Sequence, residues 1–317
     1  MANTRIISTG SYLPKKILSN FDLEKIVDTT DQWILERTGI SERRIADENE
    51  FTSDLAYRAG LDALKNVDKD KIDMIIVATT TPDRTFPSVA TMVQHKLGIK
   101  NNCFAYDIQA VCSGFVYALT IADNFIKAGT VKRALVIGAE TMSRIVDWTD
   151  RGTCILFGDG AGAVVVEATE EKSGILATSL HSDGQYTDLL YSSGGVCHGQ
   201  ATGHIIMEGR EVFKLAVNKM CESIDTALEK VDLGYKDIDL LVPHQANKRI
   251  LDGVAKKLGI SEDKVIITVD KHGNTSSASI PLALDCAVKN GKIRKDDIVV
   301  MEALGGGLTW GSIVIKW

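Results

Sequence analysis

The sequence predicts an α/β protein built from two similar halves, and three observations lead to this prediction. Short aliphatic segments typical of buried strands alternate with longer segments of helical periodicity. The strand-like segment IDMIIVATT at 72–80 is matched by IDLLVPHQA at 238–246. The interval from Cys112 to Gly129 equals the interval from Asn274 to Gly291, at 17 residues. The same order of elements therefore occurs twice.

Each half continues in the same way after its first strand. In the first half we expect a helix between Cys112 and Gly129, a strand at 133–140 and, after a glycine-rich turn, a β run within 158–168. The second half repeats this with a helix ending at Gly291, a strand at 297–304 and a β run within 305–317. Proline suits the first turn of a helix, so Pro281 places the second helix after Asn274. The charge-rich segment 167–174 is the best boundary, which divides the chain into halves at 1–172 and 173–317.

This order of elements also predicts where a site lies. Strands that alternate with helices favour parallel sheets joined by crossovers, and ligands bind outside the carboxyl ends of such strands. Cys112 and Asn274 are expected at matching turns of the two halves, and His244 at the end of a second-half strand. The three side chains should therefore meet between the halves.

Composition and charge exclude several classes of protein. The net charge of −6 argues against nucleic-acid or membrane-surface binding, which needs a concentrated basic field. No apolar run is long enough to span a membrane and the start lacks a signal-type segment, so we expect a cytoplasmic protein. The six cysteines form no CxxC pair, so neither a disulfide framework nor a metal site is expected. The glycine-rich segments do not fit GxGxxG and lead into strands, which excludes a dinucleotide loop.

A thiol, an imidazole and a carboxamide together suit thioester chemistry. The thiol can hold an acyl group, and the other two groups can donate hydrogen bonds to a negative oxygen. A helix start beside Cys112 should lower its pKa towards 7. Taken singly, each residue also has an ordinary interpretation: a buried structural cysteine, a structural histidine or a turn asparagine.

Several motifs together resemble those of the bacterial β-ketoacyl-acyl carrier protein synthase III family, of the thiolase-like superfamily, over essentially the whole chain. They are STGSYLP (8–14), DQWILERTGI (31–40), VCSGFVYAL (111–119), DRGTCILFGDGAGA (150–163), GREVFK (209–214), LVPHQAN (241–247), HGNTSSAS (272–279) and EALGGGLTWGS (302–312). The combination of Cys, His and Asn distinguishes this family from elongating synthases and thiolases. The resemblance implies a thiolase-like fold, with mixed sheets in an αβαβα layered arrangement.

The resemblance also implies a reaction. A starter acyl-CoA, with acetyl-CoA expected, acylates Cys112, and malonyl-acyl carrier protein then loses CO2 and condenses with the acyl group. The products are 3-ketoacyl-acyl carrier protein, CO2 and CoA, and the step initiates type II fatty-acid synthesis. His244 and Asn274 are expected to stabilise the enolate, and the backbone N–H groups of Cys112 and Gly306 the second oxyanion. No cofactor or metal is implied, since the CoA thioester is itself a substrate.

Further binding residues follow from the same resemblance. Trp33 and Arg151 are expected to flank the CoA adenine, with Arg37 near its phosphates. The resemblance implies a homodimer in which Phe86 of one subunit closes the acyl pocket of the other. The pantetheine path is expected along Thr29, Gly152, Phe213, Ala246 and Asn247. A basic patch for the acidic carrier protein is expected at Lys214, Arg249, Lys256 and Lys257.

Two departures from the family pattern concern the size of the starter. Leu308 stands where many relatives have phenylalanine, and the segment 193–209 does not align cleanly. Two alternative functions remain at this point. One is an acyl transferase or hydrolase that uses Cys112 without condensation, and the other is a non-catalytic subunit that binds acyl carrier protein.

Overall fold

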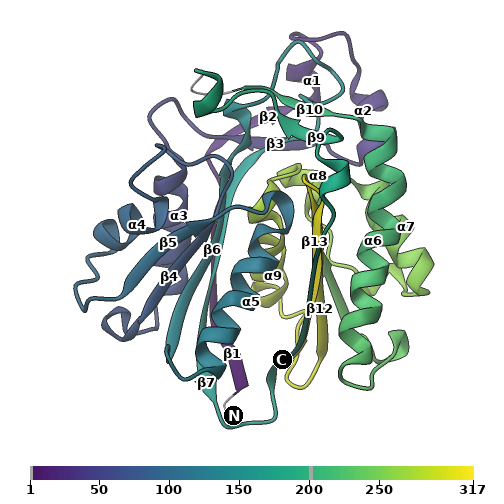
Figure 1. The fold of residues 1–317 in the computed structure, drawn as a ribbon. Helices are drawn as coiled ribbons and strands as arrows, with labels where there is room; N and C mark the ends of the chain where they lie inside the picture. Colours follow the sequence, from purple (N-terminus) through teal and green to yellow (C-terminus); the bar gives the residue numbers. More distant parts are fainter. Residues whose placement is uncertain (1–2, 200–202) are drawn as a thin grey trace.

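The computed structural model describes residues 3–199 and 203–317, and its main body consists of two β-sheets (Figure 1). The first sheet has the order β1-β7-β6-β4-β5, with bounds Asn3–Tyr12, Asp159–Thr169, Arg133–Thr141, Met74–Ala78 and Phe104–Ile108. The second has the order β11-β12-β13-β8, with bounds Leu240–Pro243, Ile298–Gly305, Thr309–Lys316 and Gly174–Ser182.

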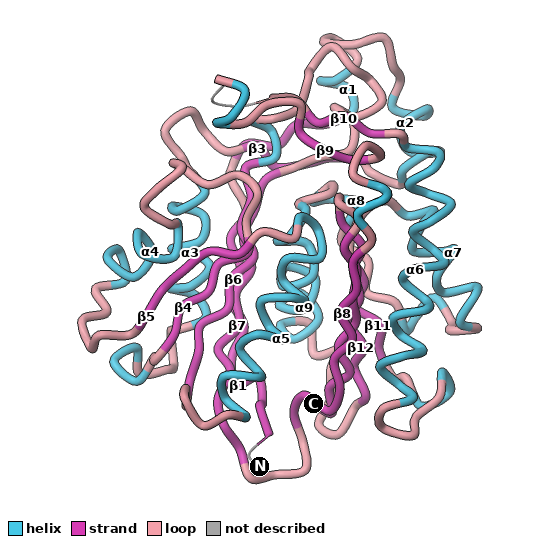
Figure 2. The backbone as a smooth tube through the Cα atoms, viewed as in Figure 1, coloured by secondary structure: helices cyan, strands magenta, loops and turns pink. Residues whose placement is uncertain are grey.

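Helices form three layers around these sheets (Figures 1 and 2). The central layer consists of α5 (Gly114–Lys127) and α9 (Ser279–Lys289). The first sheet is covered on its outer face by α3 (Thr52–Ala63) and α4 (Val89–Leu97), and the second by α6 (Gly209–Glu229) and α7 (Lys248–Leu258). The predicted order of helix, sheet, helix, sheet, helix is therefore confirmed.

Shorter elements gather at one end of the layers, above the central helices in Figure 1. They are β2 (Lys16–Ser19), α1 (Asn20–Leu23), α2 (Asp31–Thr38), β3 (Glu42–Ile45), β9 (Leu190–Ser192), β10 (Ile205–Met207) and α8 (Val269–His272). Within the described residues, no helix is both long enough and apolar enough to cross a membrane.

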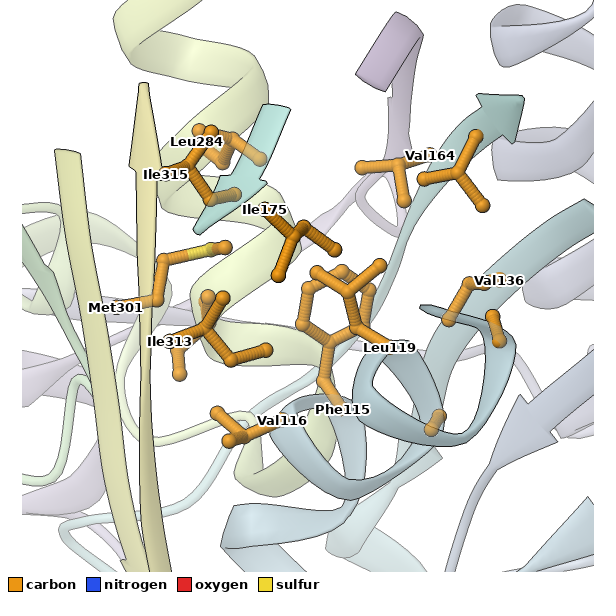
Figure 3. Close-up of a cluster of buried hydrophobic side chains, with 14 of the residues drawn as sticks. Phe115, Val116, Leu119, Val136, Val164, Ile175, Leu284, Met301, Ile313 and Ile315 are labelled. Atoms are coloured by element: carbon orange, nitrogen blue, oxygen red, sulfur yellow. The ribbon is translucent and has the colours of Figure 1, made fainter. Parts of the chain in front are cut away.

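The core lies where α5 meets both sheets (Figure 3). Phe115, Val116 and Leu119 are fully buried, because α5 is enclosed on more than one side. They pack against Val136 and Val164 of the first sheet and against Met301 and Ile313 of the second. This packing holds the start of α5, and hence Cys112, at a fixed place between the halves.

The strand pairings confirm the duplication that the sequence predicts. In the first sheet β4 pairs in parallel with both β5 and β6, and in the second β11 pairs in parallel with β12. The following strands, β7 and β13, are antiparallel to their neighbours, so both sheets are mixed. The counterpart of β5 in the second half is reduced to a single bridge between Leu241 and Val265. The predicted boundary at 172/173 falls in the link between β7 and β8, and the division into two domains stays a prediction.

The predicted match between Cys112 and Asn274 is wrong by three residues. Cys112 lies in a 3₁₀ turn at 111–113 directly before α5, and the equivalent turn before α9 spans 276–278. Both turns open on a residue with positive φ, 48° at Val111 and 49° at Ser276. Ser277 therefore corresponds to Cys112. The prediction failed because it counted back from the glycine after each helix, Gly129 or Gly291, and α5 starts one turn further before its glycine than α9 does.

The glycines at 160 and 162 also differ from expectation, because they lie inside β7 and not in the turn before it. A Cβ atom at Gly162 would lie 2.6 Å from the backbone nitrogen of Leu282 in α9. On the adjacent strand β6, a Cβ atom at Gly138 would overlap the carbonyl oxygen of Ser277. These glycines let the loop and helix of the second half approach the first sheet closely.

Candidate active site

A cavity of about 1350 Å³ opens at the carboxyl ends of the strands, as predicted. Cys112, which follows β5, His244, which follows β11, and Asn274, in the loop before α9, all line it. Three side chains from distant parts of the sequence thus share one cavity.

The thiol of Cys112 is buried, with 4% of the residue exposed. Burial raises its pKa to about 12, a hydrogen bond from Ser276 opposes this rise, and the nearby carboxyl of Glu140 adds to it. The expectation that the helix start lowers this pKa towards 7 is therefore wrong, because burial raises the pKa instead. Desolvation of the thiolate is the largest cause, and the hydrogen bonds from Ser276 and from the backbone at Cys112 only partly oppose it.

His244 is held at the end of β11 by its backbone and by its ring. The backbone N–H of His244 donates to the carbonyl of Glu302 on β12 at 2.8 Å, and the ring nitrogen Nδ1 lies 2.7 Å from the Ser279 hydroxyl. Burial lowers the pKa of the imidazole to about 3, so the ring is neutral near pH 7. The neighbouring residue Gln245 is also buried, and its side chain bonds the backbone at Pro243, Ile266, Thr268 and Val269.

Asn274 is fixed by its backbone and by its carboxamide oxygen. Its N–H donates to Leu156 O at 2.8 Å, and its own carbonyl accepts from Gly158 N–H at 3.0 Å. Its Oδ1 accepts from the Ser276 N–H at 2.9 Å. The carboxamide NH2 group is therefore the part left to donate to a ligand.

A buried carboxyl group beneath this site was not identified from the sequence. Glu140, at the end of β6, is fully buried and accepts hydrogen bonds from both halves. Its partners include the Thr81 hydroxyl at 2.6 Å, the Ser277 hydroxyl at 2.9 Å and the Ser276 hydroxyl at 3.2 Å. Burial raises the pKa of Glu140, while these hydrogen bonds oppose the rise. The sequence carries no local signal for this cluster, because its donors come from segments about 60 and 136 residues away.

The outer part of the cavity holds two of the three residues expected at the nucleotide end of CoA, whereas Arg151 does not line it. Trp33 and Arg37 line it, and the Arg37 guanidinium lies 4.7 Å from the centroid of the Trp33 ring. The Arg151 guanidinium lies 5.1 Å from the same centroid, and Arg151 donates to Asp28 O. An aromatic base between Trp33 and Arg151 would require the arginine to move away from the ring.

The other predicted binding residues divide into two groups. The first group lines the cavity and consists of Gly152, Phe213, Lys214, Ala246, Asn247 and Arg249. Thr29, Phe86, Gly306, Lys256 and Lys257 do not line it. Phe86 is 81% exposed, so within one chain it is not a core aromatic.

The predicted basic patch lies on two packed helices. Lys214 of α6 and Arg249, Lys256 and Lys257 of α7 are exposed, and α6 packs against α7. Arg249 lies over the Phe213 ring at 5.5 Å, at the edge of the cavity. Lys214 forms an ion pair with Glu211, which partly neutralises it.

The glycine loop places Gly305, and not Gly306, against the backbone of Cys112. A Cβ atom at Gly305 would lie 2.8 Å from the Cys112 nitrogen, whereas one at Gly306 would lie 2.6 Å from the Leu190 carbonyl. The role of the Gly306 N–H stays a prediction. Leu308 is fully buried in the cluster around α6 and does not line the cavity.

The unaligned segment 193–209 contributes directly to the cavity wall. Gly194, Val196, Ile205 and Met207 are among its lining residues, while 200–202 lie outside the described residues. In the described ranges, no group of three or more His, Cys, Asp or Glu residues has the arrangement of a metal site.

Comparisons with known proteins agree with these features. The family described as 3-oxoacyl-[acyl-carrier-protein (ACP)] synthase III matches residues 106–184, and the family of its C-terminal part matches residues 228–317. The chain is 57% identical over 319 residues to beta-ketoacyl-[acyl-carrier-protein] synthase III of Ehrlichia canis, with 100% of both chains covered. It is also 57% identical over 320 residues to the protein of that name from Thiobacillus denitrificans, again over 100% of both chains.

Solved structures give the same result for the fold. The crystal structure of 3-oxoacyl-[acyl-carrier-protein] synthase III from Aquifex aeolicus superposes with a TM-score of 0.95 at 52% identity, covering 99% of this chain and 100% of that one. The Pseudomonas aeruginosa synthase III structure gives 0.94 at 39% identity, covering 99% and 98%.

Proposed function

This chain belongs to the 3-oxoacyl-acyl carrier protein synthase III family, and on that premise we propose that it catalyses the condensation that initiates type II fatty-acid synthesis. It is an acyl-transferring condensing enzyme with a thiolase-like fold. The observation that carries the proposal is that Cys112, His244 and Asn274 line a single cavity.

In the first half-reaction, the Cys112 sulfur attacks the thioester carbonyl of acetyl-CoA or another short acyl-CoA. The carbon–sulfur bond to CoA breaks, and the CoA sulfur takes up the proton that Cys112 loses. Because burial disfavours a free thiolate, the thiol loses its proton as it attacks and not beforehand. The N–H groups of Cys112 and Gly306 are the proposed donors to the oxyanion at the acyl carbon.

In the second half-reaction, malonyl-acyl carrier protein loses CO2 and forms an enolate on its thioester oxygen. His244 Nε2–H and the Asn274 carboxamide donate hydrogen bonds to this oxygen. The enolate carbon then attacks the acyl group on Cys112, which leaves as the thiolate and regains a proton. Neither half-reaction involves a net change of oxidation state, so the proposal includes no redox cofactor, and it assigns the stabilisation of the enolate to hydrogen-bond donors and not to a metal.

Binding of the substrates uses the outer cavity and its rim. We assign Trp33, Arg37 and Arg151 to the nucleotide end of CoA. The pantetheine arm is proposed to pass Gly152, Phe213, Ala246 and Asn247, which line the cavity, and Thr29, which lies outside it. The acidic carrier protein docks on Lys214, Arg249, Lys256 and Lys257, where charge attraction favours association.

The proposal includes a homodimer in the cytoplasm. The exposed side chain of Phe86 is proposed to close the acyl pocket of the second subunit. All six cysteines are free thiols, which suits a reducing compartment.

The test is mass spectrometry of the protein after incubation with a panel of acyl-CoAs, followed by addition of labelled malonyl-acyl carrier protein. One acyl group should appear on Cys112, and CO2 and 3-ketoacyl product should follow. Cys112→Ala should abolish labelling, whereas Cys221→Ala, which removes a buried thiol outside the cavity, should keep it.

Other outcomes would change the assignment. Acylation without CO2 release would identify an acyl transferase or hydrolase. Binding of acyl carrier protein without acylation of Cys112 would indicate a non-catalytic subunit.

A further inference from the structure

The imidazole of His244 has a buried hydroxyl partner that comes from the segment carrying Asn274. Ser279 is the first residue of α9, and its hydroxyl lies 2.7 Å from His244 Nδ1. Both residues are 2% exposed. Among the described residues, this contact is the one hydrogen bond of the ring, so its direction decides which nitrogen carries the hydrogen.

The direction follows from the hydrogen-bonding capacity of the hydroxyl, which has one hydrogen and two acceptor sites. The backbone N–H of Gln245 lies 3.3 Å from Ser279 Oγ, and an N–H can only donate. If Nδ1 also donated, the Ser279 hydrogen would need another acceptor, and the described residues offer it none. The hydroxyl therefore donates to Nδ1.

Gln245 keeps this arrangement in place. Its Nε2 donates to the carbonyls of Pro243 and Ile266, each at 2.9 Å. Its Oε1 accepts from the N–H groups of Thr268 and Val269 at 2.8 and 3.0 Å. With both ends of its side chain bonded, the backbone N–H of Gln245 stays directed at Ser279.

We propose that Ser279 is a positioning residue that holds His244 in the tautomer with its hydrogen on Nε2. A neutral ring has one ring hydrogen, and a ring that accepts at Nδ1 must carry it on Nε2. Burial keeps the ring neutral by lowering its pKa to about 3.

The same short segment thereby prepares both donors of the second half-reaction. The Ser276 N–H occupies the carboxamide oxygen of Asn274, which leaves its NH2 group to donate. The Ser279 hydroxyl occupies Nδ1 of His244, which leaves Nε2–H to donate. In the opposite tautomer Nε2 would present a lone pair to the enolate and repel it. The effect of the tautomer on CO2 release rests on the proposed function, whereas the tautomer itself is a property of the free protein.

The experiment measures the tautomer and the chemistry separately. Nitrogen-15 NMR of the protein labelled at histidine distinguishes Nε2–H from Nδ1–H rings, and the signal that disappears in His244→Gln identifies the residue. In the wild-type protein His244 should be the Nε2–H form. Ser279→Ala should move the ratio of the two forms about tenfold towards Nδ1–H, the factor that corresponds to loss of one hydrogen bond of about 1.4 kcal/mol, and should lower CO2 release in proportion to the fraction of the Nε2–H form that is lost. Acylation of Cys112 should change by less than about twofold, since it does not use this donor.

Two further variants control for structure. Ser279→Thr keeps the hydroxyl and should restore both the Nε2–H signal and CO2 release. Ser223→Ala removes a buried hydroxyl that pairs with Ser312 outside the cavity, and it should change neither readout. Thermal unfolding of each variant reports any general loss of stability.

Three results would overturn the proposal. The first is a wild-type His244 with its hydrogen on Nδ1. The second is a Ser279→Ala protein that keeps the pure Nε2–H form and normal CO2 release. The third is a Ser279→Thr protein that is folded and in the Nε2–H form but still slow. Absence of CO2 release from the wild-type protein would instead refute the proposed function, and the NMR result would stand apart from it.

Discussion

The thiol of Cys112 should become more reactive with rising pH up to at least about pH 10. Burial raises its pKa from 9.0 to about 12, and the charge of Glu140 adds to this rise. At a given pH below 9, a shift of this size lowers the thiolate fraction about 1000-fold, which corresponds to about 4 kcal/mol. The thiolate is the form that alkylating reagents attack, so the rate constant should rise about tenfold for each pH unit.

The assay is alkylation by iodoacetamide between about pH 6 and pH 10, with the modified peptide quantified by mass spectrometry. The exposed thiol of Cys197 is removed by Cys197→Ser, so that it does not compete for reagent. Glu140→Gln removes a carboxyl group whose charge raises the thiol pKa, and it should accelerate alkylation at each pH. Asp159→Asn removes another buried carboxyl, outside the cavity, and should leave the profile unchanged.

A plateau above about pH 8 would refute this reasoning. It would mean that the helix start lowers the thiol pKa to near 7, as the sequence suggests, and that burial costs the thiolate little. Ser276→Ala supplies a check of the opposite sign. It removes the hydrogen bond that lowers the pKa of Cys112, so it should slow alkylation.

Four further predictions concern chemistry, recognition and stability. Asn274→Ala should slow CO2 release from malonyl-acyl carrier protein by about 10² to 10³-fold but leave acetyl uptake within about tenfold, as measured by paired single-turnover assays; normal CO2 release with failed acylation would reverse the assigned role. Phe86→Ala should extend the accepted starter length while activity on short starters remains, and an unchanged chain-length profile in a folded dimer would contradict its role. Arg249→Glu should weaken condensation and spare acylation from CoA, whereas Lys236→Glu, which changes an exposed lysine outside the patch, should leave both activities unchanged; equal loss of both activities in Arg249→Glu would point to misfolding. Glu302 is buried without a hydrogen-bond partner among the described residues, and burial raises its pKa from 4.5 to about 8. The folded state therefore binds a proton that the unfolded state releases, so stability falls as pH rises from about 5 to about 7.5, by about 3 kcal/mol. Glu302→Gln should lack this loss in denaturant unfolding at the two pH values, and equal pH dependence in both proteins would contradict it.

Local patterns account for what could be predicted of the fold. The strands β4 and β11 and the helices α5 and α9 lie where the aliphatic runs and closing glycines predict them. Pro281 lies in the first turn of α9, as its fixed φ and missing N–H predict. Such features depend on residues a few positions apart, so they can be recognised without knowledge of the packing. Local patterns could not explain the glycines inside β7, because these glycines make room for the close approach of helix α9, about 120 residues later in the chain.

The sequence by itself determined the duplication, the order of the layers and the identity of three chemically suited side chains. The elements repeat in order, and Cys112, His244 and Asn274 each lie next to a predicted strand or helix. Only the tertiary structure decided their chemical states. The pKa of a thiol depends on how completely water is removed from it, and the tautomer of an imidazole depends on the partner of each ring nitrogen. Burial by both halves keeps the thiol of Cys112 protonated. The hydroxyl of Ser279, 35 residues from His244, determines which ring nitrogen of His244 carries the hydrogen. Both effects come from contacts between distant segments, which form only when the two halves pack together.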